Sequence, residues 1–160
     1  MPGIGFDLIS EMNYIHNKML LNCAFGNDVA LQSVPYTKQG VTGQKPLFEV
    51  IGQLYAQGLK KLQRKEQLIV PYLQYFNYTT EDKEFAKNCK SIRNHLVQQV
   101  RNRKVSLRKT DFSEIAHPDL MTIFLYENDF KTKEKQIIDE CLTFIVAAMR
   151  PTTVASANML

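Results

Sequence analysis

In the C-terminal part of the chain, small residues open a notch in an otherwise bulky apolar repeat, and hydroxyl-bearing residues follow it. Ala147 and Ala148 interrupt the bulky side chains of an apolar helical repeat, and Thr152 follows about one turn later. Arg150 and Pro151 stand between them. Proline in a helix interior removes a backbone N–H donor and clashes with the carbonyl four residues earlier. Spacing alone therefore favours a core helix kinked by its proline.

The cysteines and histidines offer little further chemistry. The cysteines are widely spaced and odd in number, so a disulfide framework is not expected, and their surroundings predict buried thiols at Cys23, Cys89 and Cys141. The three histidines lack the spacing of metal ligands, both among themselves and relative to cysteine. These residues therefore predict no metal site.

A basic run is the other candidate for function. The segment from Phe85 to Lys109 contains eight Lys or Arg and no acid, namely Lys87, Lys90, Arg93, Arg101, Arg103, Lys104, Arg108 and Lys109. Nucleic-acid binding would need these cations on one face, beside aromatic residues or a reading helix. Interleaved aromatics are missing and the rest of the chain is net acidic. The run therefore favours a solvated helix face and basic loop, with no nucleic-acid partner, and a basic helical nucleic-acid binder is the weaker alternative.

Apolar residues recur every three or four positions over most of the chain, which predicts an all-α fold. One helix is expected from Leu8 to a stop at Gly26, another over residues 47–62 and a third after the caps Thr79 and Thr80. A short helix opening at Pro118 and a last, longest helix within residues 131–160 complete the set. Residues 33–46 contain two prolines and two glycines, which predicts a loop.

The length of 160 residues and an ordinary composition, 44% hydrophobic and 22% charged, predict one domain over residues 1–160. A net charge of +4 says little about partners. No signal peptide is visible, and no apolar run is long enough for a membrane span.

Several of these segments resemble, in order, the middle of the cytochrome P450 family of haem-thiolate monooxygenases. "DECLTFIVAAMRPTTVASANML" is similar to the family's long I helix, where an A-G-x-[DE]-T-T motif follows a similar lead-in. "NCAFGND" resembles the end of the family's E helix, and "PDLMTIFLYEN" resembles its H region. The helices at residues 47–62 and 81–104 fall where its F and G helices would. The resemblance implies a partial P450-like helical domain ending in an I-type helix.

The resemblance also implies a function and a set of site residues. It implies haem as cofactor, and oxidation of a small hydrophobic organic substrate with electrons from a reductase. Phe144, Ala147 and Ala148 would line the substrate and oxygen groove. Arg150 would stand at the motif's acid, Pro151 at its first threonine and Thr152 at its second, so the proton relay would be degenerate.

The chain departs from the family in one decisive respect. It has neither the F-x-x-G-x-R-x-C-x-G loop that supplies the haem-ligand cysteine nor the E-x-x-R pair before it. The isolated chain is therefore expected to be inactive as a monooxygenase, and its enzyme status stays open. A helical interaction or structural protein on a degenerate scaffold is the main alternative. Localisation is not indicated, although members of the family in eukaryotes are often associated with the endoplasmic reticulum membrane.

Overall fold

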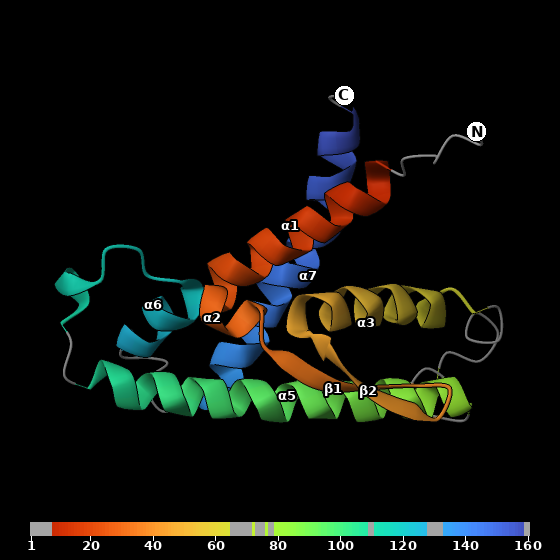
Figure 1. Ribbon diagram of the computed structural model, residues 1–160, viewed down its shortest axis with the longest axis horizontal. Helices are drawn as coiled ribbons and strands as arrows, with labels where there is room; N and C mark the ends of the chain where they lie inside the picture. The colour runs from red at the N-terminus through yellow and green to blue at the C-terminus, as the bar shows by residue number, and fades with distance from the viewer. Residues whose placement is uncertain are drawn as a thin grey trace. The chain divides into compact units, whose positions relative to one another are not determined.

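A computed structural model describes residues 8–64, 72, 76, 79–108, 111–127 and 133–158 (Figure 1). The chain divides into two compact units, one formed by residues 1–30 and 110–160 and the other by residues 31–109. Each unit is described below by itself. The prediction of a mostly helical protein is confirmed, and one two-stranded sheet corrects the all-α assignment. The prediction of a single domain over residues 1–160 stays a prediction.

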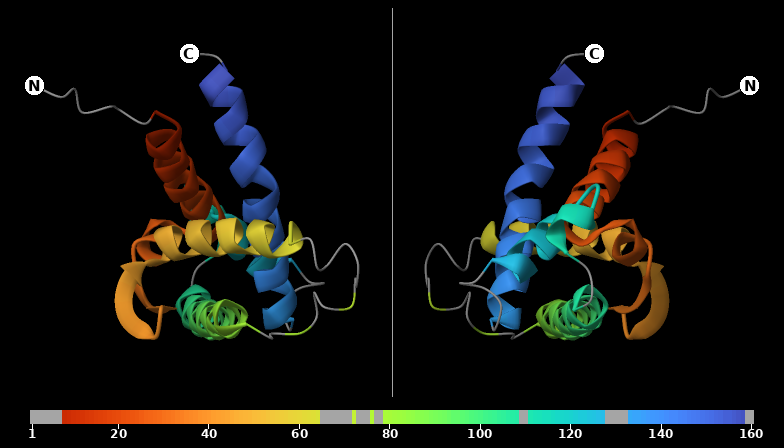
Figure 2. Two further views of the ribbon diagram at one scale, coloured as in Figure 1. Left: turned by 90° about the vertical axis from the view of Figure 1, so that its right-hand side faces the viewer. Right: turned by 90° about the vertical axis from the view of Figure 1, so that its left-hand side faces the viewer.

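The first unit is helical within its described residues. It contains α1 (Leu8–Phe25), α2 (Asn27–Ala30), the 3-10 helix η2 (Phe112–Glu114), α6 (Leu120–Tyr126) and α7 (Glu134–Asn158). α1 packs against α7, and α6 contacts both (Figure 2). Fully buried side chains on these helices include Leu21, Phe25, Met121, Ile137, Ile138 and Ile145. Their mutual burial holds this unit together.

The ends of two helices in this unit follow from local chemistry. Gly26 adopts a φ of 85°, and its N–H donates to the Asn22 carbonyl at 2.9 Å. A left-handed glycine with this bond ends a helix, so the predicted stop at Gly26 is confirmed. α6 begins slightly after the predicted Pro118, because the Asp119 side chain accepts a 2.7 Å hydrogen bond from the Thr122 N–H.

The second unit combines a hairpin with two helices. Strands β1 (Ser33–Lys38) and β2 (Val41–Pro46) pair antiparallel and lead directly into α3 (Leu47–Leu62), and α5 (Thr80–Leu107) packs against β1 and α3. The prediction of a loop over residues 33–46 is wrong. Gln39 and Gly40 both have positive φ, at 51° and 78°, which makes the two-residue turn that suits a hairpin. Val34 and Tyr36 point to the buried side of β1, as strand alternation requires.

The helices of this unit begin as the sequence indicates. α3 covers the predicted residues 47–62. α5 begins at a capping box, in which the Thr79 hydroxyl accepts from the Asp82 N–H at 3.0 Å. α5 contains 28 residues and α7 contains 25, so the expectation that the last helix is the longest is wrong among the described elements. α5 extends beyond Val100, the last buried residue of its apolar face, through a segment rich in Lys and Arg, which favour helix.

Candidate functional site

The residues predicted to line a substrate groove lie on different sides of α7. The buried face of this helix is formed by Ile137, Ile138, Cys141, Ile145 and Met149. Phe144 is 44% exposed, Ala147 is exposed and Ala148 is half-buried. Ala147 therefore faces away from the packed side of α7, whereas Phe144 and Ala148, one turn apart, border it.

The residues matched to the proton relay lie in the last turns of α7. The helix continues through Pro151, whose side chain is exposed, to Thr152, which is half-buried. The backbone of Arg150 is helical, and its side chain lies outside the described part of the structure. The roles implied for these three positions stay predictions.

The cysteines differ in exposure, and the prediction that all three are buried is wrong. Cys23 is exposed, Cys89 is half-buried and only Cys141 is buried. The Cys141 thiol lies 3.9 Å from the Ala24 carbonyl oxygen. Burial, reinforced by the negative charges of Asp119 and Glu140, raises the pKa of Cys141 to about 12.

Haem of the implied type needs a thiolate ligand, and Cys89 and Cys141 do not fit that role. Cys141 stays protonated near neutral pH and is directed at a backbone carbonyl. Burial raises the pKa of Cys89 as well, although Lys61 and Arg93 partly oppose the shift. Among the described residues, no group of three or more His, Cys, Asp or Glu is arranged to hold a metal ion.

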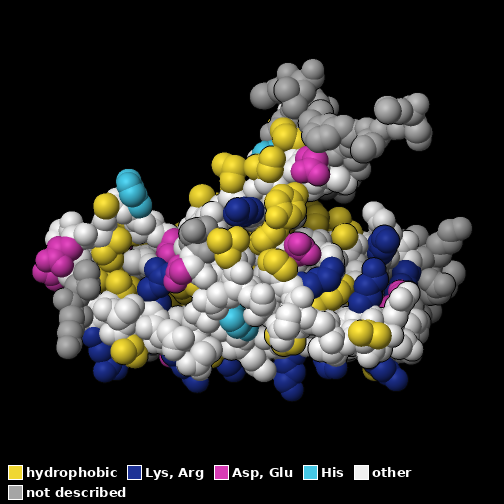
Figure 3. All heavy atoms as spheres, viewed as in Figure 1, with side chains coloured by type: hydrophobic (Ala, Val, Ile, Leu, Met, Phe, Trp, Pro, Cys, Tyr) yellow, Lys and Arg dark blue, Asp and Glu magenta, His cyan; other side chains and the backbone are white. Residues whose placement is uncertain are grey.

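The basic run contributes to one exposed line along α5, which we call the basic face. It consists of the exposed side chains Lys83, Lys87, Lys90, Arg101 and Arg108. Their separations of four, three, eleven and seven residues each approximate whole helical turns, so they share one side over about 37 Å. The buried side chains Ile92, Leu96 and Val100 occupy the opposite side of the helix. Figure 3 shows Lys and Arg side chains at intervals along the edge of α5.

The charge of the chain is divided unevenly between its two units. Residues 31–109 contain fifteen Lys or Arg against five Asp or Glu, a net charge of +10. The remaining residues contain five Lys or Arg against eleven Asp or Glu, a net charge of −6. The modest total of +4 conceals this asymmetry, which is typical of chains that bind a polyanion through one part.

Polar side chains of α5 attach the hairpin to this helix. The buried Asn88 accepts from the Thr37 N–H at 2.9 Å and donates to the Thr37 carbonyl at 2.8 Å. Glu84 accepts from the N–H groups of Gln39 and Gly40 at 3.0 and 2.7 Å. α5 therefore satisfies backbone groups of β1 and its turn as a neighbouring strand would. Sequence spacing gave no signal for these contacts.

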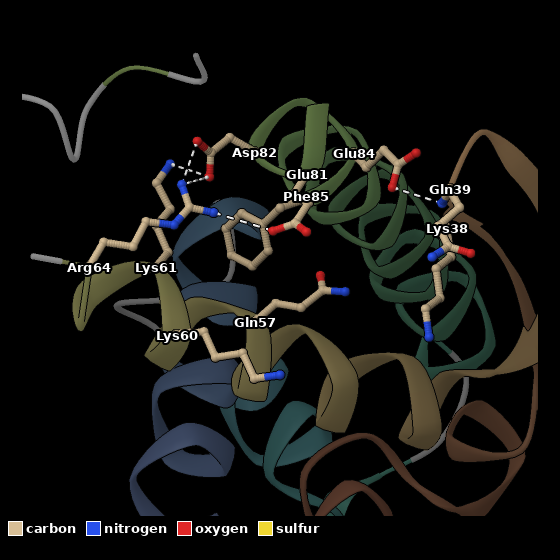
Figure 4. A pocket seen from close by; sticks show the side chains of 10 residues that line it. All are labelled: Lys38, Gln39, Gln57, Lys60, Lys61, Arg64, Glu81, Asp82, Glu84 and Phe85. Atoms are coloured by element: carbon tan, nitrogen blue, oxygen red, sulfur yellow. Dashed lines mark hydrogen bonds and ion pairs between the residues drawn. The ribbon is translucent and has the colours of Figure 1, made fainter. Parts of the chain in front are cut away.

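A pocket of about 260 Å³ opens between α3, the start of α5 and the hairpin turn (Figure 4). Its lining residues are Lys38, Gln39, Gln57, Lys60, Lys61, Arg64, Glu81, Asp82, Glu84 and Phe85. The set combines four cations with three acids, an aromatic ring and two amides. The pocket wall is therefore mostly polar, and Phe85 gives it one apolar surface.

An ion-pair cluster occupies one side of this pocket. Asp82 is only 2% exposed, and its two oxygens accept from Arg64 Nη1 at 3.1 and 2.9 Å. Lys61 lies 3.8 Å from the same carboxylate, and Arg64 also reaches Glu81 at 3.5 Å. Burial alone would raise the pKa of Asp82, but hydrogen bonds from Thr79 and Arg64 outweigh it and lower the pKa. The buried Asp82 carboxylate therefore has both hydrogen-bond and ion-pair partners.

No protein-family model, curated protein or solved structure matches the chain. The P450 resemblance therefore rests on the sequence similarity of a few segments and on their order. Of the helices in the described ranges, none is both long and apolar enough to cross a bilayer. The basic face and the pocket, both on residues 31–109, are the features on which function can be argued.

Proposed function

We propose that the protein binds the phosphate backbone of duplex nucleic acid through the basic face of α5. The observation that supports this most directly is the alignment of five exposed cations on one outward line, with no acid from Phe85 to Lys109. The run by itself left open whether its cations share a face. Four cations of the run share one side of α5 with Lys83, whereas Arg93, Arg103 and Lys104 lie off this line. This shared side favours the alternative that the sequence ranked lower, over the expectation of no nucleic-acid partner.

Elementary electrostatics favours a duplex as the occupant. Double-stranded DNA carries about one negative charge per 1.7 Å of its axis, so a row of cations about 37 Å long can neutralise several phosphates at once. Each neutralised phosphate releases a condensed counterion, which drives binding. Single strands are usually held by aromatic side chains that stack on bases, and α5 has no aromatic residue after Phe85. Binding through phosphates alone is expected to be largely independent of base sequence.

The test is the salt dependence of binding to a fluorescein-labelled duplex, followed by anisotropy. The double variant Lys87→Gln/Lys90→Gln removes two charges of the basic face. The control Lys38→Gln/Lys60→Gln removes two exposed charges elsewhere in the same unit. We expect the first variant to weaken binding and to reduce the slope of log affinity against log salt by about 1.8, and the control to change the slope little. Equal slopes for wild type and both variants would overturn the proposal.

The monooxygenase function remains a separate prediction, supported only by the similarity and the order of the segments. When bound, haem would supply oxygen activation, but Cys89 and Cys141 do not offer it a thiolate ligand. No step of such a reaction can be assigned to residues of this chain. A helical interaction or structural protein is compatible with the same observations, and nucleic-acid binding would be one such interaction.

A further inference from the structure

The pocket between α3, α5 and the hairpin turn is lined by four cations and three acids, and all three acids are already engaged. Asp82 is neutralised by Arg64 and Lys61, and Glu81 is paired with Arg64. Both oxygens of Glu84 accept from backbone N–H groups of the hairpin turn. Each acid of the wall therefore already has a partner, and the wall presents no unpaired carboxylate to a ligand.

Two lysines of the same pocket wall remain available to a ligand. Lys38 at the end of β1 and Lys60 near the end of α3 are exposed, and neither has an ion-pair partner among the described residues. Figure 4 shows Gln57 between them, with the Arg64 cluster and the Glu84-bound turn on either side. Gln57 donates to the Tyr36 hydroxyl at 2.9 Å, so one N–H of its amide is already engaged. A ligand anion in the pocket would meet the two ammonium groups.

The pocket also has an apolar surface. Phe85 lies against Gly58 of α3, where an added Cβ would stand 3.7 Å from the ring. The helices can therefore approach closely here, and Phe85 remains half-buried at the pocket wall. An aromatic ring in such a position can contact a flat ring of a ligand. The volume of about 260 Å³ lies just below the usual range for drug-sized ligands, so it suits a small one.

We infer that this pocket binds a small phosphomonoester that carries a flat ring, of the size of a mononucleotide. Lys38 and Lys60 hold the phosphate, and Phe85 contacts the ring. The site is separate from the basic face and does not depend on duplex binding. The same chemistry could come from a free mononucleotide or from the phosphorylated end of a strand, and these two sources can be distinguished by experiment.

The test is calorimetric titration of the full chain with adenosine 5′-monophosphate. Ribose 5-phosphate lacks the ring and adenosine lacks the phosphate, so both should bind more weakly. Lys38→Gln/Lys60→Gln should weaken binding about tenfold, as expected for two solvent-exposed charge pairs. Lys87→Gln/Lys90→Gln, on the basic face, is the matched control and should bind like wild type. Phe85→Leu should abolish the advantage of adenosine 5′-monophosphate over ribose 5-phosphate.

Three outcomes would overturn the inference. These are no binding at millimolar adenosine 5′-monophosphate, equal binding by wild type and the Lys38/Lys60 variant, and equal binding by adenosine 5′-monophosphate and ribose 5-phosphate. A short single strand with a 5′-phosphate identifies the source when it is compared with the same strand lacking that phosphate, both titrated into the Lys87→Gln/Lys90→Gln variant. A 5′-phosphate that tightens binding beyond that of the mononucleotide indicates a strand end, and weaker binding than the mononucleotide indicates a free nucleotide. Because each double variant affects one site only, failure here leaves the duplex proposal intact, and the reverse also holds.

Discussion

At the scale of residues, the strongest electrostatic feature is the buried carboxylate of Asp82. It caps the start of α5, and Arg64 and Lys61 approach it from α3 and the residues that follow that helix. The cluster joins two basic residues, Lys61 and Arg64, to two acids, Glu81 and Asp82, that are 17 or more residues further along the chain. The capping role of Thr79 could be predicted from sequence. The pairing with Arg64 could not, because it depends on how α3 packs against α5.

Replacing Asp82 by Asn should lower the free energy of unfolding by about 1–3 kcal/mol at pH 7, because Arg64 then loses its buried counter-charge. The folded-state pKa of Asp82 lies below its ordinary value near 3.8. Its stabilisation is therefore fully present above that value and is lost as pH falls through the lowered pKa. Urea unfolding should accordingly show a difference between wild type and variant that is full at pH 7 and smaller near pH 2.

Glu81→Gln is the control for this comparison, because Glu81 is 88% exposed and sits 3.5 Å from Arg64. Its effect at pH 7 should stay within about 0.5 kcal/mol. An Asp82→Asn variant as stable as wild type at pH 7 would contradict the assignment. So would a difference that does not shrink in acid.

At the scale of elements, the bounds of α3 and the stop at Gly26 could be predicted because their signals are local. An apolar repeat runs along α3, and a left-handed glycine ends α1. The hairpin was missed because its turn is Gln39–Gly40, a weaker signal than Asn–Gly, and because Pro35 lies within β1. Its attachment to α5 depends on Asn88, which is 51 residues from Thr37.

Asn88→Ala should therefore destabilise the protein by about 2–4 kcal/mol, because it leaves the buried N–H and carbonyl of Thr37 without partners. The loss should be localised, with faster amide hydrogen exchange at Thr37 than in wild type. Asn94→Ala changes the same residue type at an exposed position of the same helix, and should alter stability by less than about 0.5 kcal/mol. Unchanged protection of the Thr37 amide in Asn88→Ala would show that the hairpin is held by other contacts.

At the scale of the whole molecule, function is argued from charge placement. The basic run was visible in the sequence, and a projection at 100° per residue would have placed four of its cations on one side together with Lys83. The pocket could not be predicted in this way, because its residues come from three segments between Lys38 and Phe85. The net charges of +10 and −6 on the two units also depend on a division that only the structure supplies.

Whether the chain binds haem, as the monooxygenase resemblance implies, is also a question about the whole molecule. Reduced protein incubated with haem and treated with CO should show no thiolate-type absorbance band, because the only buried thiol, among the described cysteines, has a pKa of about 12. Cys141→Ser should give the same spectrum as wild type, since that thiol is directed at the Ala24 carbonyl. A thiolate-type band that disappears in Cys141→Ser would instead identify an iron ligand, and would return the α7 residues Phe144, Ala147 and Ala148 to consideration as a substrate groove. Duplex binding measured on the same preparation would then decide whether the basic face acts alone or beside a haem site.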